Sequence, residues 1–273
     1  MWSRLVLSVV FGIVEGVTEW LPISSTGHLI LLEHLVSFGV SDAFFELFEV
    51  VIQLGAILAV AVLFWGKLNP FARRKSAAER RESFALWGRV MIAALPSALV
   101  GLLLDDWLDA HLYNAVVVAA MLILYGVGFL LVERKCKGTI AVGSTEAIST
   151  RAALGVGCFQ ILALIPGTSR SGATILGGMC LGLARPVAAE FSFFLGIPTM
   201  VGAGALKGVK FALSGAVLSG EEWLLLITAS VTAFLTSLVV IRFLLDFVRR
   251  RSFAVFGAYR IVLGAAVLIL TFI

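Results

Sequence analysis

Charged residues are scarce in this 273-residue chain. Lys, Arg, Asp and Glu make up 14% of the sequence and hydrophobic residues 60%, whereas a soluble domain has about 25% charged residues. This composition excludes a disordered chain and a nucleic-acid-binding protein, and it does not fit an ordinary soluble enzyme. The net charge of +4 is typical of a membrane protein whose cytoplasmic loops face anionic lipid.

Cysteine and histidine are also rare, with three residues of each. Cys136, Cys158 and Cys180 have no paired spacing, so the sequence predicts neither a disulfide framework nor a zinc site. Arg4 is the only basic residue before Glu15, and no small-residue cleavage site accompanies it. We therefore expect the N-terminus to be retained as structure and not removed as a signal peptide.

Six apolar stretches predict transmembrane helices, since a span takes about 20 apolar residues. They cover residues 47–65, 90–104, 115–132, 186–205, 224–245 and 254–273. The second of them is short for a span.

Two further apolar regions, residues 4–36 and 152–183, are interrupted. Pro22 and residues 24–28 break the first, and residues 166–172 break the second. Non-helical backbone at membrane depth survives only where protein or a water-filled cavity surrounds it. The sequence therefore predicts an all-α integral membrane protein with six transmembrane helices and two re-entrant helical hairpins.

The distribution of Lys and Arg supports this topology. Residues 66–89, 133–151 and 242–251 together carry fifteen basic residues, whereas the alternating loops, 105–114 and 206–223, carry two. Because cytoplasmic loops are enriched in Lys and Arg, both termini are expected on the extracytoplasmic side of the membrane.

The two interrupted regions resemble each other. Residues 21–25 align with residues 165–169, and Glu49 aligns with Glu190. We interpret the chain as a single membrane domain, residues 1–273, with a first inverted repeat at 1–132, a cytoplasmic connecting loop at 133–151 and a second repeat at 152–273. Inverted repeats with broken helices place a ligand site near the membrane midplane.

Glu15 and Glu19 lie four residues apart before the first break, on one face of a helix. Two adjacent buried carboxylates are tolerated when a cation lies between them, and oxygen ligands suit Mg²⁺ or Ca²⁺. Protonation of one carboxylate is the alternative.

The first break carries Ser24, Ser25, Thr26 and His28. Ser24 and Thr26 are typical caps of a following helix, whose free N–H groups would bind an anion. His28 follows closely on two carboxylates and two hydroxyls, which favours a functional role over a structural one.

The second break carries Ser169, Arg170, Ser171 and Thr174. A guanidinium at membrane depth can bind phosphate oxygens bidentately, or it can pair with a Glu. We predict that Arg170 binds substrate together with Ser169, Ser171, Thr174, Ser24 and Thr26. Carboxylates, a guanidinium, helix N-termini and hydroxyls together indicate a phosphate-handling site for a lipid-linked substrate.

Other charged residues at membrane depth are expected to have structural roles. Glu49, Glu190 and Gln53 are predicted to bond to the re-entrant backbone, and Arg185 and Arg260 to lie at the membrane interface.

Residues 15–28 and 166–174 resemble the two signatures of the bacterial undecaprenyl pyrophosphate phosphatases, the bacitracin-resistance type. The resemblance extends along essentially the whole chain. It implies hydrolysis of undecaprenyl pyrophosphate to the monophosphate, recycling of the lipid carrier for cell-wall synthesis, and bacitracin resistance.

The resemblance also implies roles for individual residues. Glu15 and Glu19 match the metal or acid/base carboxylates of the family, Ser25 a nucleophile, His28 a base or nucleophile, and Arg170 the pyrophosphate clamp. Attack by Ser25, by His28 or by activated water fits the sequence. The expected partners are a polyprenyl diphosphate and membrane lipid, with no nucleic acid, and a homodimer is compatible with the sequence.

Two rival classes of membrane protein can be compared with this interpretation. Inverted repeats with broken helices are also a transporter or flippase architecture. A second class of membrane phosphatases needs a His after its Ser-Arg pair, but the histidines here are His28, His34 and His111, so that mechanism lacks its nucleophile.

Overall fold

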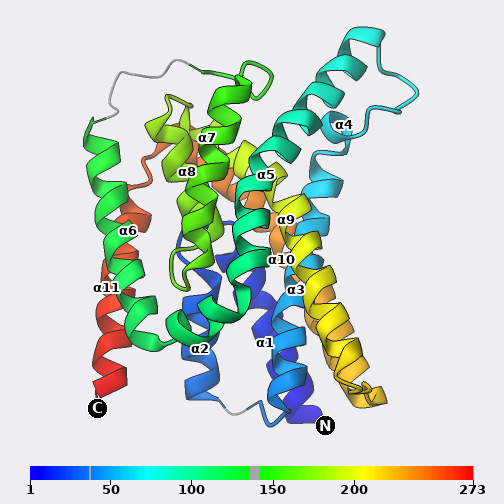
Figure 1. Cartoon of the computed structure of the whole chain (residues 1–273), viewed down its shortest axis with the longest axis vertical. Helices are drawn as coiled ribbons and strands as arrows, with labels where there is room; N and C mark the ends of the chain where they lie inside the picture. Colours follow the sequence, from blue (N-terminus) through cyan, green and yellow to red (C-terminus); the bar gives the residue numbers. More distant parts are fainter. Residues whose placement is uncertain (37, 136–141, 273) are drawn as a thin grey trace.

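The computed structural model describes residues 1–36, 38–135 and 142–272, and the elements of these parts are helices apart from one isolated bridge between Val142 and Leu183. Helices run through most of the described chain (Figure 1). They are α1 (Trp2–Thr18), α2 (Ser25–Leu35), α3 (Asp42–Leu63), α4 (Trp65–Leu68), α5 (Ala77–Leu112), α6 (Ala115–Lys135), α7 (Thr150–Ile161), the 3₁₀ turn η1 (Leu162–Leu164), α8 (Arg170–Cys180), α9 (Arg185–Leu213), α10 (Gly220–Arg250) and α11 (Ala254–Phe272).

The six predicted spans are confirmed as helices. Within the described residues, α3, α5, α6, α9, α10 and α11 are long and apolar enough to cross a membrane. The second span is longer than the sequence suggested, because α5 begins at Ala77 in a capping box made by Ser76 and Glu79. The polar residues before 90 thus extend the helix and do not form a loop.

The two predicted interruptions are confirmed as breaks between helices. The first break, residues 19–24, separates α1 from α2, and the second, residues 165–169, follows η1 and precedes α8. Each ends on a serine with positive φ, 74° at Ser24 and 70° at Ser169. Left-handed backbone is uncommon for a residue other than Gly, so both turns are held by specific contacts.

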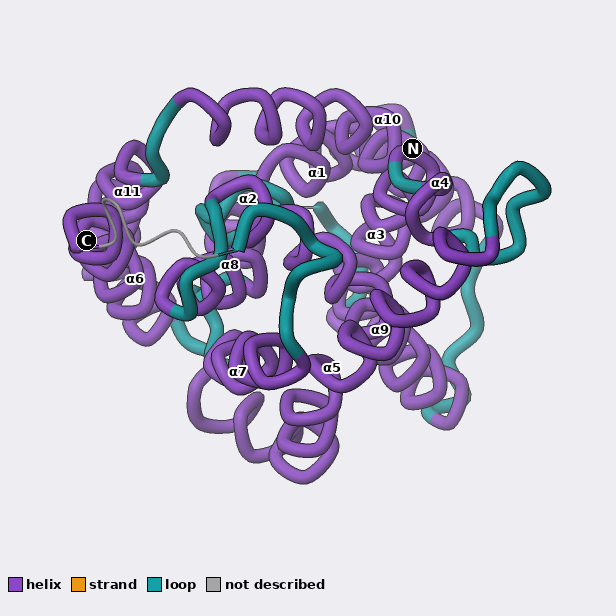
Figure 2. The backbone as a smooth tube through the Cα atoms, turned by 90° about the horizontal axis from the view of Figure 1, so that it is seen from above, coloured by secondary structure: helices purple, strands orange, loops and turns teal. Residues whose placement is uncertain are grey.

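Close helix contacts hold the breaks inside the molecule. Seen from above, α2 and α8 lie inside a ring of longer helices (Figure 2). On one side of the ring α1 packs against α10. A Cβ on Gly12 would lie 2.4 Å from the carbonyl oxygen of Ala229. Glycine at this position therefore lets the two backbones approach each other.

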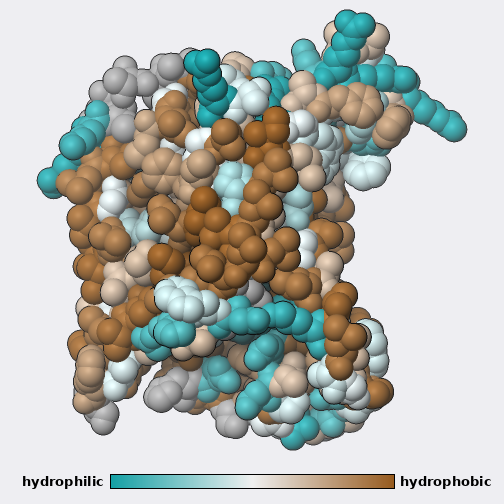
Figure 3. Space-filling view, in the orientation of Figure 1, coloured by the Kyte–Doolittle hydropathy of each residue, from teal (hydrophilic) through white to brown (hydrophobic). Residues whose placement is uncertain are grey.

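The outer surface is apolar over much of its height. Hydrophobic side chains cover the middle of the face shown in Figure 3, and hydrophilic residues gather toward both ends. Leu103 and Val239 are 81% and 68% exposed, as lipid-facing side chains would be. The described chain is thus a multi-pass membrane protein, with both termini at the same end of the molecule (Figure 1).

Candidate active site

The two breaks contact each other through Glu19. Its Oε1 accepts a hydrogen bond from Nη2 of Arg170 at 3.0 Å, and its backbone oxygen accepts one from the Ser171 hydroxyl, also at 3.0 Å. Residues more than 150 positions apart in the chain thus meet at one point. The pairing of Arg170 with a glutamate, one of the two roles predicted for it, is confirmed.

Glu19 also accepts a hydrogen bond from the Ser25 hydroxyl. The Oγ of Ser25 lies 2.7 Å from Glu19 Oε2, and both residues are buried. One carboxylate therefore binds a guanidinium with one oxygen and a hydroxyl with the other. A carboxylate in this position can accept the proton of a serine nucleophile.

Several neighbours fix the guanidinium of Arg170. Its Nη1 donates to the Ser192 backbone oxygen at 2.6 Å, and its Cζ lies 5.7 Å from the centre of the Trp20 ring. A Cβ on Gly196 would come within 2.9 Å of Arg170 Cζ. Glycine at 196 therefore leaves the space that the guanidinium occupies.

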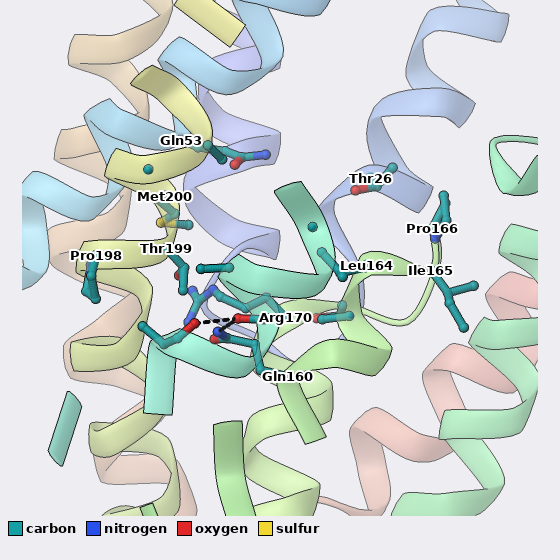
Figure 4. A pocket seen from close by; sticks show the side chains of 18 of the residues that line it. Thr26, Gln53, Gln160, Leu164, Ile165, Pro166, Arg170, Pro198, Thr199 and Met200 are labelled. Atoms are coloured by element: carbon teal, nitrogen blue, oxygen red, sulfur yellow. Dashed lines mark hydrogen bonds between the residues drawn. The ribbon is translucent and has the colours of Figure 1, made fainter. Parts of the chain in front are cut away.

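A cavity of about 500 Å³ opens beside this cluster. Its polar lining includes Glu19, Ser25, Thr26, Ser169 and Arg170, and its apolar walls come mostly from α5 and α9. In Figure 4, Thr26 and Pro166 lie on one side of the cavity, Pro198, Thr199 and Met200 lie opposite, and Arg170 lies between them. The cavity joins a charged end to an apolar wall, as an amphiphilic ligand requires.

Glu15 lies just outside this lining. Its side chain is fully buried, and neither carboxylate oxygen has a hydrogen-bond partner in the described part of the chain. Two unpartnered oxygens on the helix turn before Glu19 fit a divalent cation, because Mg²⁺ is often held by one or two carboxylates plus phosphate and water. Within the described residues no group of three or more His, Cys, Asp or Glu is placed to hold a metal ion by itself, so substrate and water would supply the remaining ligands.

Ser24 and Ser169 cap the helices that follow the two breaks. The Oγ of Ser24 accepts from the Gly27 N–H at 3.3 Å, and that of Ser169 accepts from the Gly172 N–H at 3.1 Å. The predicted capping is confirmed for Ser24, whereas Thr26 lies in the first turn of α2 and lines the cavity. The N-termini of α2 and α8 thus both lie beside the cavity.

His28 does not contact the Ser25 hydroxyl. Its Nδ1 lies 2.7 Å from the Ser24 backbone oxygen and its Nε2 lies 2.7 Å from the Tyr259 hydroxyl. It is also not one of the residues that line the cavity. Glu19, and not His28, therefore occupies the position next to the Ser25 hydroxyl.

Ser171 and Thr174 support the second break from inside the protein. Both are buried and lie outside the cavity lining. The Thr174 hydroxyl donates to the Arg170 backbone oxygen at 2.8 Å and lies 2.7 Å from the Ser192 hydroxyl. In this structure these two predicted substrate-binding residues hold Arg170 and Glu19 in place.

The expectation that Arg260 lies at the membrane interface is wrong. Its side chain is fully buried and donates to the backbone oxygens of Pro22, Gly167 and Thr168 at 3.1, 2.9 and 2.8 Å. One guanidinium thus holds both breaks. The signal in the sequence was its position as the only charged residue of an apolar stretch, but sequence alone does not show which face of that helix is buried.

The backbone role predicted for Glu190 is also wrong. Its carboxylate accepts from Lys67 Nζ at 2.6 Å, and Lys67 also pairs with Glu146 at 3.3 Å. Burial would raise the pKa of Glu146, but hydrogen bonds from its own backbone N–H and from Ser144, together with Lys67, hold that pKa at about 2. This cluster joins α4, α9 and the loop that precedes α7. Gln53, by contrast, lines the cavity.

Comparisons with known proteins give the same family as the sequence signatures. Residues 8–266 match the family described as "Bacitracin resistance protein BacA". The chain is 50% identical to an "Undecaprenyl-diphosphatase" of Enterococcus faecalis (strain ATCC 700802 / V583), over 97% of this chain and 96% of that protein. Relatives of the same name in Streptococcus mutans serotype c and Streptococcus suis (strain 05ZYH33) are 52% and 51% identical, over 98% and 100% of this chain and 96% and 99% of theirs. The predicted family is therefore confirmed, and the chain belongs to the BacA family.

Proposed function

We propose that this protein is an undecaprenyl-diphosphatase. It hydrolyses undecaprenyl diphosphate to undecaprenyl phosphate and inorganic phosphate, which recycles the lipid carrier of cell-wall synthesis and confers bacitracin resistance. The observation that carries the proposal is the cluster of Glu19, Ser25 and Arg170 beside a cavity with apolar walls. Homologues with this activity in their names match over nearly the whole chain.

The diphosphate binds at the polar end of the cavity. Arg170 presents its guanidinium there, and the N-termini of α2 and α8 add the positive ends of two helix dipoles. Thr26 and Ser169 supply hydroxyls in the cavity lining. The apolar walls formed by α5 and α9 contact the prenyl chain.

The hydroxyl of Ser25 attacks the terminal phosphorus while Glu19 accepts its proton. The bond between that phosphorus and the bridging oxygen breaks, and undecaprenyl phosphate leaves. Water then releases phosphate from the serine, and the proton held by Glu19 returns to the serine oxygen. Attack by a water molecule that Glu19 activates is the alternative, in which Ser25 is not the nucleophile and no covalent intermediate forms.

Glu15 and Glu19 would hold a divalent cation, Mg²⁺ or Ca²⁺. Such a cation would neutralise charge that develops on the leaving phosphate. The unpartnered oxygens of Glu15 support this assignment.

The topology proposed for this chemistry has two re-entrant hairpins within an inverted repeat, residues 1–132 and 152–273. The termini and the site then face the outside of the bacterial inner membrane, and the basic loops face the cytoplasm. The shared position of both termini at one end of the molecule supports this arrangement (Figure 1).

Phosphate release from a long-chain prenyl diphosphate in detergent tests the proposal. We expect turnover by the purified protein, loss of turnover in excess chelator, and recovery when Mg²⁺ or Ca²⁺ is restored. Absence of phosphate release with either metal would refute the activity. Full turnover in excess chelator would refute only the cation.

A further inference from the structure

The two ring nitrogens of His28 both contact fixed groups. Nδ1 lies 2.7 Å from the backbone oxygen of Ser24, which can only accept, so Nδ1 carries a proton. Nε2 lies 2.7 Å from the Tyr259 hydroxyl, and the two rings are parallel within 2°. In a neutral imidazole Nε2 is then the acceptor, and Tyr259 donates to it.

The carbonyl that His28 holds belongs to the strained residue of the first break. Ser24 has a φ of 74° and directly precedes Ser25. The backbone N–H of His28 also donates to this carbonyl, at 3.4 Å. Two donors of one residue therefore fix the peptide group that joins Ser24 to Ser25.

The second break is held differently. Ser169 has the same positive φ, and its carbonyl accepts from the N–H of Ala173, which has no imidazole. Arg260 instead holds the carbonyls of Gly167 and Thr168. Tyr259 and Arg260 are consecutive on α11, so one turn of this helix supports both breaks.

We propose that Tyr259 is a positioning residue that acts through His28. Its hydroxyl donates to Nε2 and fixes the orientation of the imidazole, the imidazole fixes the Ser24 carbonyl, and the Ser25 hydroxyl is thereby directed toward Glu19. His28 is likewise a positioning residue and not the base. The proposal rests on the role of Ser25 in the proposed function.

A double-mutant cycle on phosphate release tests the chain of contacts. Tyr259→Phe keeps the ring and removes the hydroxyl, and we expect kcat to fall about ten-fold while KM stays within about two-fold because Arg170 is untouched. Tyr113→Phe removes the same group at the end of α5 and serves as the matched control. His28→Ala should lower kcat further, and His28→Ala/Tyr259→Phe should match His28→Ala alone.

Two kinetic outcomes would overturn the proposal. One is a wild-type kcat in Tyr259→Phe. The other is a double variant whose loss equals the product of the two single losses, because independent effects multiply. Absence of phosphate release by the wild-type protein would refute the proposed activity instead, and the spectroscopic test below would still decide the positioning role.

Nitrogen NMR of the imidazole provides that second test. His34→Gln and His111→Gln leave His28 as the one histidine in the sequence. We expect a neutral ring protonated on Nδ1, and a changed Nε2 resonance when Tyr259→Phe is added. A proton on Nε2, or a spectrum that Tyr259→Phe leaves unchanged, would contradict the proposal.

Discussion

At the residue scale, the two oxygens of Glu19 have different partners. One accepts from the Arg170 guanidinium and the other from the Ser25 hydroxyl. The sequence could predict these residues, because broken helices with carboxylates, hydroxyls and an arginine indicate phosphate chemistry. It could not predict that Ser25 bonds to Glu19 while His28 bonds to Ser24, because residues one helical turn apart can turn their side chains to different partners.

A substitution that keeps the charge of Arg170 tests whether the shape of its guanidinium is needed. Arg170→Lys should lower kcat/KM by about 100-fold, because an ammonium group cannot bind two phosphate oxygens with the planar fork of a guanidinium. Arg185→Lys is the matched control, since the Arg185 guanidinium binds the Glu133 carboxylate outside the cavity lining. Near-normal kinetics of Arg170→Lys would show that only its long-range charge matters.

Arg260 should matter for stability as well as activity. Arg260→Met removes the donors that three buried carbonyl groups share, and unsatisfied buried polar groups cost about 1–3 kcal/mol each. We expect a lower melting temperature in detergent and lower turnover, with Arg260→Lys between Arg260→Met and wild type. An unchanged melting temperature in Arg260→Met would contradict a stabilising role of Arg260 at the two breaks.

At the element scale, apolar length and interruptions predicted the helices well. Every predicted span is a helix, and both breaks fall where proline, glycine and hydroxyl residues cluster. The start of α5 was missed because a helix continues through the polar residues 77–89, where hydropathy gives no signal. The contact of α1 with α10 was not predictable either, since it depends on which glycines face another backbone.

The glycine contact between α1 and α10 gives a matched pair of substitutions. A Cβ at Gly12 would meet the Ala229 oxygen at 2.4 Å, whereas a Cβ at Gly208 on α9 has no neighbour within 4 Å. Gly12→Ala should destabilise the protein by about 1–3 kcal/mol because the helices must separate. Gly208→Ala should be neutral or slightly stabilising because alanine favours helix, and equal melting temperatures would refute the close contact.

At the scale of the whole molecule, the two halves supply the site jointly. Glu19 and Ser25 come from the first half, Arg170 comes from the second, and Arg260 holds both breaks. The resemblance between the two interrupted regions of the sequence had indicated that the two halves would form one site together. The counts of Lys and Arg in the loops predicted which loops lie on the same side of the membrane. The buried face of α11, which carries Arg260, could not be predicted because it depends on packing.

The proposed sidedness can be tested by labelling with a membrane-impermeant thiol reagent. In a chain without its native cysteines, Val217→Cys should react from outside the cell, and Arg74→Cys should react only after permeabilisation. Both positions are exposed in the structure, so access depends on the side of the membrane. Labelling of Arg74→Cys in intact cells would invert the topology and place the site on the cytoplasmic side.

The initial rate of phosphate release by Ser25→Ala tests whether the hydroxyl of Ser25 attacks phosphorus. The Ser25 hydroxyl donates a hydrogen bond to Glu19 beside Arg170, as the proposed nucleophile should. With a long-chain prenyl diphosphate and Mg²⁺, the variant should fold with the melting temperature of the wild type and lose about 1,000-fold or more in kcat. A folded Ser25→Ala protein that keeps a tenth or more of the wild-type rate would show that Ser25 is not the nucleophile.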